Sequence, residues 1–160
     1  MGNQRKEQIQ QGNAFQDAVE RTHDLNGGYC PGLQALKKVD AARISIDDGS
    51  KADGSVDIDN CTKEKYPNAT RWDYGVGYGG ETLFIEVHPA STSEVTKMKE
   101  KLSWLKSWLK SQAPELDALP KHNPAFCWIA SGKVAILKGS REHLSLSKLG
   151  LLPSKHLTIK

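Results

Sequence analysis

The sequence predicts a mixed α/β fold, of the α+β kind, in which helices flank a mixed sheet built around one central β-hairpin. Two strand-like runs, RWDYGVGY and ETLFIEVH, lie on either side of Gly79-Gly80, a pair that is typical of tight hairpin turns. A long amphipathic helical pattern follows the second run at once. Further helical and strand patterns on both sides of this unit predict helices covering the sheet.

The segment before the hairpin is predicted to contain one or two helices and two short strands. Asn13 suits the N-cap of a helix over residues 14–23, and the segment GLQALKKVDAAR from Gly32 is a candidate for a second, shorter helix. Residues 43–60 alternate between apolar and polar side chains around a polar turn, which predicts two short strands.

The segment after the hairpin is predicted to hold the longest helix. Ser91 and Glu94 have the spacing of a capping box at its start. Residues 125–137 then form an apolar run broken by Ser-Gly and are expected to be another hairpin. Ser140 suits the cap of a short helix, and the alternating C-terminus predicts an edge strand. The apolar stripe of the long helix consists of Val95, Met98, Leu102, Leu105 and Leu109.

Length and composition are those of a globular protein. The 160 residues suit one domain, which we expect to span residues 13–160 behind a polar extension over residues 1–12. The net charge of +3 permits a nucleic-acid partner without requiring one. No apolar run has the length of a membrane span and no signal-peptide core is present, so we expect a cytoplasmic location.

The hairpin predicts a pair of opposed acidic side chains. If Gly79 and Gly80 form the turn, Asp73 lies opposite Glu86, on the face that also carries His88. Like charges in that position destabilise a sheet, and a divalent cation, Mg²⁺ or Mn²⁺, would account for them. The opposite face of the second strand, with Leu83, Ile85 and Val87, is expected to lie beneath the long helix.

Two alternatives to this acidic pair are open. Arg71 could reach Glu86 diagonally across the hairpin and form a salt bridge with it. A turn of three residues would instead shift the register by one residue and separate the two acids.

An Asp on one strand followed across a turn by Glu86-Val87-His88 resembles the signature of the PD-(D/E)XK, or restriction-endonuclease-like, nuclease superfamily. The resemblance implies a restriction-endonuclease-like core and a metal bound by Asp73, Glu86 and the carbonyl group of Val87. It also implies an accessory ligand, Glu20, from the first helix. His88 stands where the family usually has Lys, and it would orient the attacking water or play a structural role.

The long helix adds a basic and aromatic stripe. Lys97 and Lys101 would stabilise charge in the transition state of phosphodiester hydrolysis. Together with Trp104 and Trp108 they form a stripe that suits nucleic-acid binding. The alternative is a solvated face on which the tryptophans only widen the contact with the core.

Two functions follow as expectations. The first is a metal-dependent nuclease that hydrolyses phosphodiester bonds, with DNA a better candidate than RNA, acting alone, as a homodimer or with a protein partner. The second is a binding protein on the same scaffold that has lost its chemistry where His88 replaces Lys. Such a protein would be an immunity or inhibitor protein, or a regulatory subunit.

Overall fold

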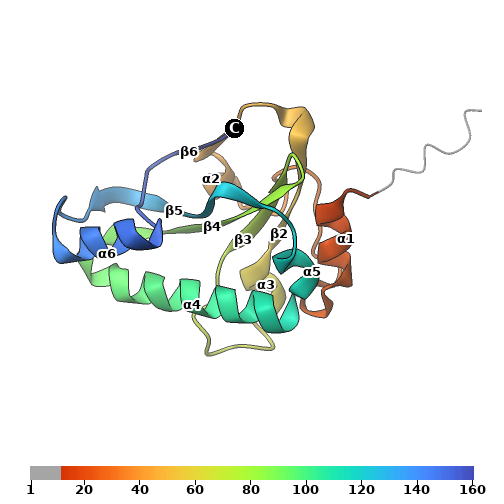
Figure 1. Ribbon diagram of the computed structural model, residues 1–160, viewed down its shortest axis with the longest axis horizontal. Coiled ribbons are helices and arrows are strands. Elements are labelled where there is room, and N and C mark those ends of the chain that lie inside the picture. The colour runs from red at the N-terminus through yellow and green to blue at the C-terminus, as the bar shows by residue number, and fades with distance from the viewer. Residues whose placement is uncertain (1–11) are drawn as a thin grey trace, which may run out of the picture.

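The main sheet has four strands and is of mixed direction. The computed structural model describes residues 12–160, so the predicted polar extension lies outside the described residues except for Gly12. Three neighbouring strands run antiparallel, and the fourth runs parallel to the third, as Figure 1 shows. This arrangement confirms the predicted mixed α+β class. In sheet order the strands are β2 (Ala52–Asp57), β3 (Tyr74–Tyr78), β4 (Glu81–Ser91) and β5 (Lys121–Ala135).

The C-terminal strand belongs to a second, smaller sheet. β1 (Ile44–Ile46) and β6 (Leu157–Ile159) pair in parallel, so the predicted edge strand lies beside β1 and not beside the main sheet. None of the helices among residues 12–160 is both long and apolar enough to cross a membrane. The described α-helices are α1 (Ala14–Arg21), α2 (Lys38–Ala41), α3 (Ile58–Thr62), α4 (Val95–Gln112), α5 (Pro114–Asp117) and α6 (Arg141–Leu149).

The β3–β4 turn is the one predicted from the Gly-Gly pair. Gly79 and Gly80 have φ angles of +58° and +82°, which residues with a Cβ rarely adopt and which suit a two-residue hairpin turn. Tyr78 pairs with Glu81 and Tyr74 with Ile85. Every pair therefore has the predicted register, and the three-residue alternative is wrong.

Side-chain caps begin two helices as predicted, but not the longest one. The N-H groups of Gln16 and His143 donate to the side chains of Asn13 and Ser140, respectively. The predicted capping box of α4 does not form. A short 3₁₀ helix, η3 (Thr92–Glu94), comes first, and the carboxylate of Glu94 bonds to a histidine of β4 instead.

Residues 125–137 do not form the predicted hairpin. They lie largely within β5, which runs alongside β4 after the chain returns through α4 and α5. The Ser-Gly pair makes an irregularity, because Ala130 and Val134 pair with β4 residues that are only two apart. The guanidinium of Arg43 donates to the carbonyl groups of Ala130 and Ser131 and stabilises this irregular segment.

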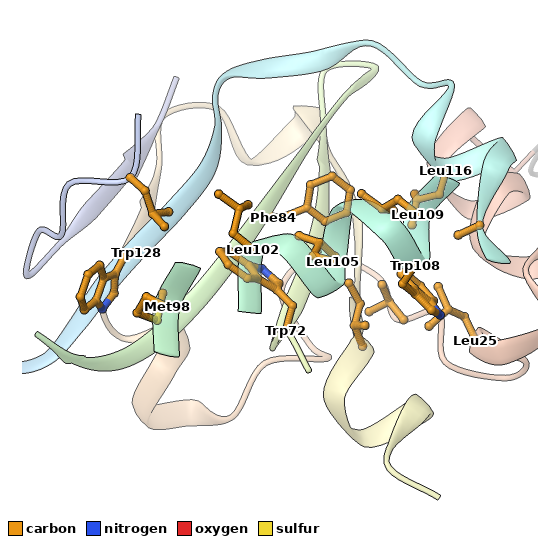
Figure 2. Close-up of a cluster of buried hydrophobic side chains, with 14 of the residues drawn as sticks. Leu25, Trp72, Phe84, Met98, Leu102, Leu105, Trp108, Leu109, Leu116 and Trp128 are labelled. Carbon is orange, nitrogen blue, oxygen red and sulfur yellow. The ribbon is translucent and has the colours of Figure 1, made fainter. Parts of the chain in front are cut away.

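Apolar side chains pack on both faces of the main sheet. α4 covers the face opposite to the one that was predicted from Leu83, Ile85 and Val87. Figure 2 shows Phe84 of β4 with Met98, Leu102 and Leu105 of α4 in one buried cluster. Leu83 and Ile85 belong to a second cluster with β1 and β6 residues on the other face. The predicted face was wrong because the path of the crossover helix decides which side of the sheet it covers. The face that carries Glu86 and His88 therefore lies beneath α4.

Candidate active site

Asp73 and Glu86 lie side by side at the open end of the hairpin. Asp73 directly precedes β3, and the strand register continued by one residue puts it opposite Glu86. The N-H group of Asp73 donates to Oε2 of Glu86 at 2.8 Å, and the N-H group of Val87 donates to Oδ2 of Asp73 at 3.0 Å. The two carboxyl groups are thus held close together by the backbone of the opposite chain segment.

A lysine of α4 provides the positive charge at this pair. Nζ of Lys101 lies 2.7 Å from Oε1 of Glu86 and donates to the carbonyl group of Arg71 at 2.9 Å. Glu86 is only 1% exposed, so this ion pair is shielded from water. The predicted alternative, a salt bridge from Arg71 to Glu86, is wrong because Nε of Arg71 donates to Asp59 at 2.8 Å.

His88 extends the pair into a short polar chain. Its Nε2 lies 2.7 Å from Oε2 of Glu94, and its Nδ1 lies 3.8 Å from Oε1 of Glu86. With Nε2 bonded to Glu94, the Nδ1 side of the ring is directed toward the acidic pair. Sequence reasoning missed Glu94 as a site residue, because its position before a helix equally suits a capping box.

Burial makes both acids of the pair reluctant to ionise. Burial raises the pKa of Asp73 to about 6, although the N-H group of Val87 and the charge of Lys101 oppose the rise. Burial, and next the negative charge of Asp73, raise the pKa of Glu86 to about 8 in spite of Lys101. Two acids that are hard to ionise next to a histidine are typical of functional sites.

Carboxyl oxygen atoms are the ligands that a hard divalent cation prefers, but three of the four oxygen atoms of this pair already have a partner. Oδ2 of Asp73 and Oε2 of Glu86 are used by backbone N-H groups, which leaves Oδ1 of Asp73 and the Lys101-bound Oε1 of Glu86. Mg²⁺ is commonly held by one or two carboxylates together with water and substrate phosphate. Among residues 12–160, no group of three or more His, Cys, Asp or Glu side chains is arranged to hold a metal ion.

The structure does not bring every predicted residue to the pair. Glu20 is exposed on α1, where its carboxylate accepts a hydrogen bond from the side chain of Gln16. Lys97 is exposed one turn before Lys101 on α4. The hydrogen bond from His88 is the main cause of the lowered pKa of Glu94, and the charge of Lys97 contributes less.

The two tryptophans of α4 have different surroundings. Trp108 is 3% exposed and its indole N-H donates to Asp24 at 3.0 Å, so it belongs to the core as the alternative interpretation expected. Trp104 is half-buried, stacks on Trp108 at 5.7 Å between ring centroids, and meets the edge of Tyr66 at 5.9 Å. Only Trp104 therefore remains accessible to a ligand.

A buried carboxylate that sequence reasoning also missed positions these aromatic rings. Asp24 accepts hydrogen bonds from Lys65, Tyr66 and Trp108. Burial favours the protonated acid, but the hydrogen bonds from Lys65, Trp108 and Tyr66 prevail and hold the pKa of Asp24 below its ordinary value. The three donors come from two distant segments, the loop after α3 and helix α4.

Replacing Asp24 by Asn should lower the free energy of unfolding by about 1–3 kcal/mol at neutral pH, because charged hydrogen bonds to Lys65 and Trp108 are lost. A carboxylate with a lowered pKa stabilises the fold above its unfolded pKa, so the difference should shrink as the pH falls below about 4. Urea unfolding at pH 7 and at pH 4 and below measures this. Asp17→Asn, at an exposed position of α1, is the control, and equal losses in both variants would contradict the role of Asp24.

Comparisons with protein-family models, with curated proteins and with solved structures find no match for this chain.

Proposed function

We propose that this protein is a metal-dependent nuclease of the restriction-endonuclease-like kind, with DNA a better candidate substrate than RNA. The observation that carries the proposal is the pair of Asp73 and Glu86, in which Glu86 is buried and Asp73 is half-buried. Two like charges side by side in a sheet cost stability, and the ammonium of Lys101 offsets only one negative charge. A site that binds a further cation and a phosphodiester accounts for the second acid.

The order of the structural elements supports the same proposal. The resemblance implies an early helix, a strand meander, a signature hairpin, then a helix and a further strand. The chain runs through α1, the meander β2–β3–β4, the crossover helix α4 and the parallel strand β5. Asp73, directly before β3, and Glu86 of β4 are the residues of this hairpin that carry the resemblance.

Each polar residue of the site has a proposed role. Asp73 and Glu86, with the carbonyl group of Val87, would hold Mg²⁺ or Mn²⁺. When bound, this ion polarises a phosphoryl oxygen and lowers the pKa of a coordinated water. Nδ1 of His88, with its Nε2 bonded to Glu94, would orient the water and accept its proton. Lys101 would stabilise the negative charge that develops on the phosphate.

A cleavage assay tests the proposal directly. Supercoiled plasmid and circular single-stranded DNA are incubated with the protein in Mg²⁺ or Mn²⁺, with EDTA as the control. We expect nicking or linearisation that requires the metal. Intact DNA in both metals, over a range of pH from 6 to 9, would contradict the proposal.

Replacing Lys101 by Met should lower the cleavage rate about 10²–10³-fold, the usual effect of removing one group that stabilises transition-state charge. Lys97→Met is the matched control, because Lys97 lies one turn earlier on α4 and is exposed. Rates are compared under single-turnover conditions. A similar small loss in both variants would show that Lys101 only neutralises Glu86.

A second candidate function is favoured by one observation. The ammonium of Lys101 already balances the charge of Glu86 at 2.7 Å, so the pair can exist without a cation. This supports a binding protein, such as an immunity protein or a regulatory subunit, that retains the scaffold without the chemistry.

The variant His88→Lys separates the two candidates, because it restores the residue that the resemblance implies. In an active nuclease that uses His88 as described, the variant should cleave at least about 10-fold more slowly, as expected for loss of a general base. A gain of cleavage over an inactive wild type would identify a degenerate nuclease. The assay is the same plasmid nicking assay.

A further inference from the structure

An aromatic hollow lies beside α4 and is not used by the proposed chemistry. It has a volume of about 170 Å³ and is open to solvent. Trp104 and Tyr66 form its aromatic walls. Polar side chains complete the lining, so the full set is Tyr66, Trp104, Ser107, Trp108, Ser111 and Gln112.

The hollow adjoins the acidic pair through direct contacts. Lys101 bonds to Glu86 and to the carbonyl group of Arg71, and the guanidinium of Arg71 donates to the carbonyl group of Tyr66 at 2.7 Å. Along α4, Trp104 follows Lys101 by three residues, so the two side chains are neighbours on one face of the helix. A base in the hollow would therefore be near the phosphate at the acidic pair.

The walls of the hollow are held rigid in the absence of a ligand. The hydroxyl of Tyr66 donates to Asp24 at 2.7 Å, and Trp108 donates to the same carboxylate. Trp104 stacks on Trp108 with an angle of 13° between the ring planes. Because the rings are already fixed, a ligand that stacks on Trp104 orders few additional side chains when it binds.

We infer that this hollow binds one unpaired nucleobase, so that the substrate class is single-stranded nucleic acid or a strand with an unpaired nucleotide. The inference rests on the proposed nuclease function. A nucleobase is flat and stacks well on the indole ring of Trp104. The side-chain amide of Gln112 supplies both a hydrogen-bond donor and an acceptor for the edge of the base. A base inside a duplex must first be unpaired and unstacked at a cost in free energy, so an unpaired base enters such a hollow more readily.

The charge at the rim fits the same ligand. Nζ of Lys65 lies 5.4 Å from the ring centroid of Tyr66, and its side chain is 54% exposed. Lys97 and Lys101 lie on the side of α4 that leads to the acidic pair. The phosphate groups on either side of a bound base would thus lie near the ammonium groups of these lysines. An apolar side chain of a protein partner would gain nothing from these charges.

Tryptophan fluorescence in EDTA tests the inference without cleavage. Trp72, Trp108 and Trp128 are buried, so a ligand that stacks in the hollow quenches mainly Trp104. The probes are an oligothymidylate of about 12 nucleotides, within the usual site size of single-strand binders, and a blunt, fully paired DNA duplex of equal length. We expect saturable quenching by the oligothymidylate and binding at least about 10-fold weaker for the duplex.

Two variants and one control make the test specific, and their binding is measured by the fluorescence anisotropy of a dye-labelled oligothymidylate, because Trp104→Ala removes the reporting tryptophan and Ser107→Trp adds another. Trp104→Ala should weaken oligothymidylate binding about 10-fold or more, the usual effect of removing a stacking platform. Ser107→Trp keeps Trp104 and fills the hollow, so it should weaken binding equally even if Trp104→Ala folds poorly. Ser103→Ala, at an exposed position of α4 that does not line the hollow, should bind like the wild type. The far-ultraviolet circular dichroism of all three is compared with the wild type.

The outcomes separate this inference from the proposed function. Quenching by the oligothymidylate without metal-dependent cleavage would support the base site and contradict the nuclease. Cleavage with equal binding of both probes, or with no effect of Ser107→Trp, would overturn the base site and leave the nuclease standing. An oligouridylate that quenches as well as the oligothymidylate supports the same single-stranded class.

Discussion

Replacing Asp73 by Asn is expected to abolish metal-dependent cleavage, with a loss of at least about 10³-fold, because a neutral amide neither holds a divalent cation well nor balances its charge. Glu86→Gln should have an effect of similar size. Both substitutions keep the size of the side chain, so the loss would report on charge and not on packing. Single-turnover cleavage of plasmid DNA in Mg²⁺ measures it.

Glu20→Gln provides the control for this prediction. The resemblance implies Glu20 as an accessory ligand, but the side chain is exposed on α1 and bonded to Gln16. We therefore expect nearly wild-type cleavage from this variant. If Asp73→Asn retained full activity, the acidic pair would not be the site of catalysis. A loss in Glu20→Gln equal to that in Asp73→Asn would mean that α1 moves toward the hairpin when substrate binds.

The second large effect concerns stability, and here the substitution is expected to cause a gain and not a loss. Glu86→Gln should raise the free energy of unfolding relative to the wild type as the pH increases. Because the pKa of Glu86 is about 8 in the folded state, above its ordinary value of 4.5, the unfolded chain ionises first. The wild type therefore loses stability as the pH rises between these values, and a glutamine, which does not ionise, avoids this loss.

Urea unfolding at pH 5 and at pH 8.5 measures the effect. We expect the stability difference between Glu86→Gln and the wild type to grow by about 1–3 kcal/mol over this interval, an order-of-magnitude value for a large pKa shift of a buried acid. Glu81→Gln is the matched control, because Glu81 lies in the same hairpin and is exposed. A difference that does not change with pH would show that Glu86 remains ionised in its pair with Lys101.

Together the two predictions define a site that is kept at a cost in stability. A variant that is more stable but inactive is the expected result for residues selected for chemistry. If Glu86→Gln were instead both less stable and fully active, the Lys101–Glu86 pair would be a structural element. The combination of both measurements thus decides whether the Lys101–Glu86 pair serves catalysis or only the structure, more firmly than either one.

Sequence patterns predicted the parts of the fold that depend on short-range interactions. The Gly79-Gly80 pair sets the turn, and the alternation of side chains along a strand sets the register that brings Asp73 opposite Glu86. The caps at Asn13 and Ser140 act over three residues of chain. All of these effects involve neighbours in sequence, so they are visible without knowledge of the rest of the molecule.

Interactions between distant segments were decided only by the tertiary structure. The path of the α4 crossover made β5 a parallel partner of β4 and put Glu86, not Leu83, beneath the helix. Only then does Lys101 reach Glu86, and only then does Asp24 receive hydrogen bonds from residues more than 40 positions away. The sequence by itself determined that two acids would meet across a turn. Which positively charged side chain lies at the two acids, and how His88 is oriented beside them, depended on packing. The free energy of packing depends on the whole chain and not on local spacing.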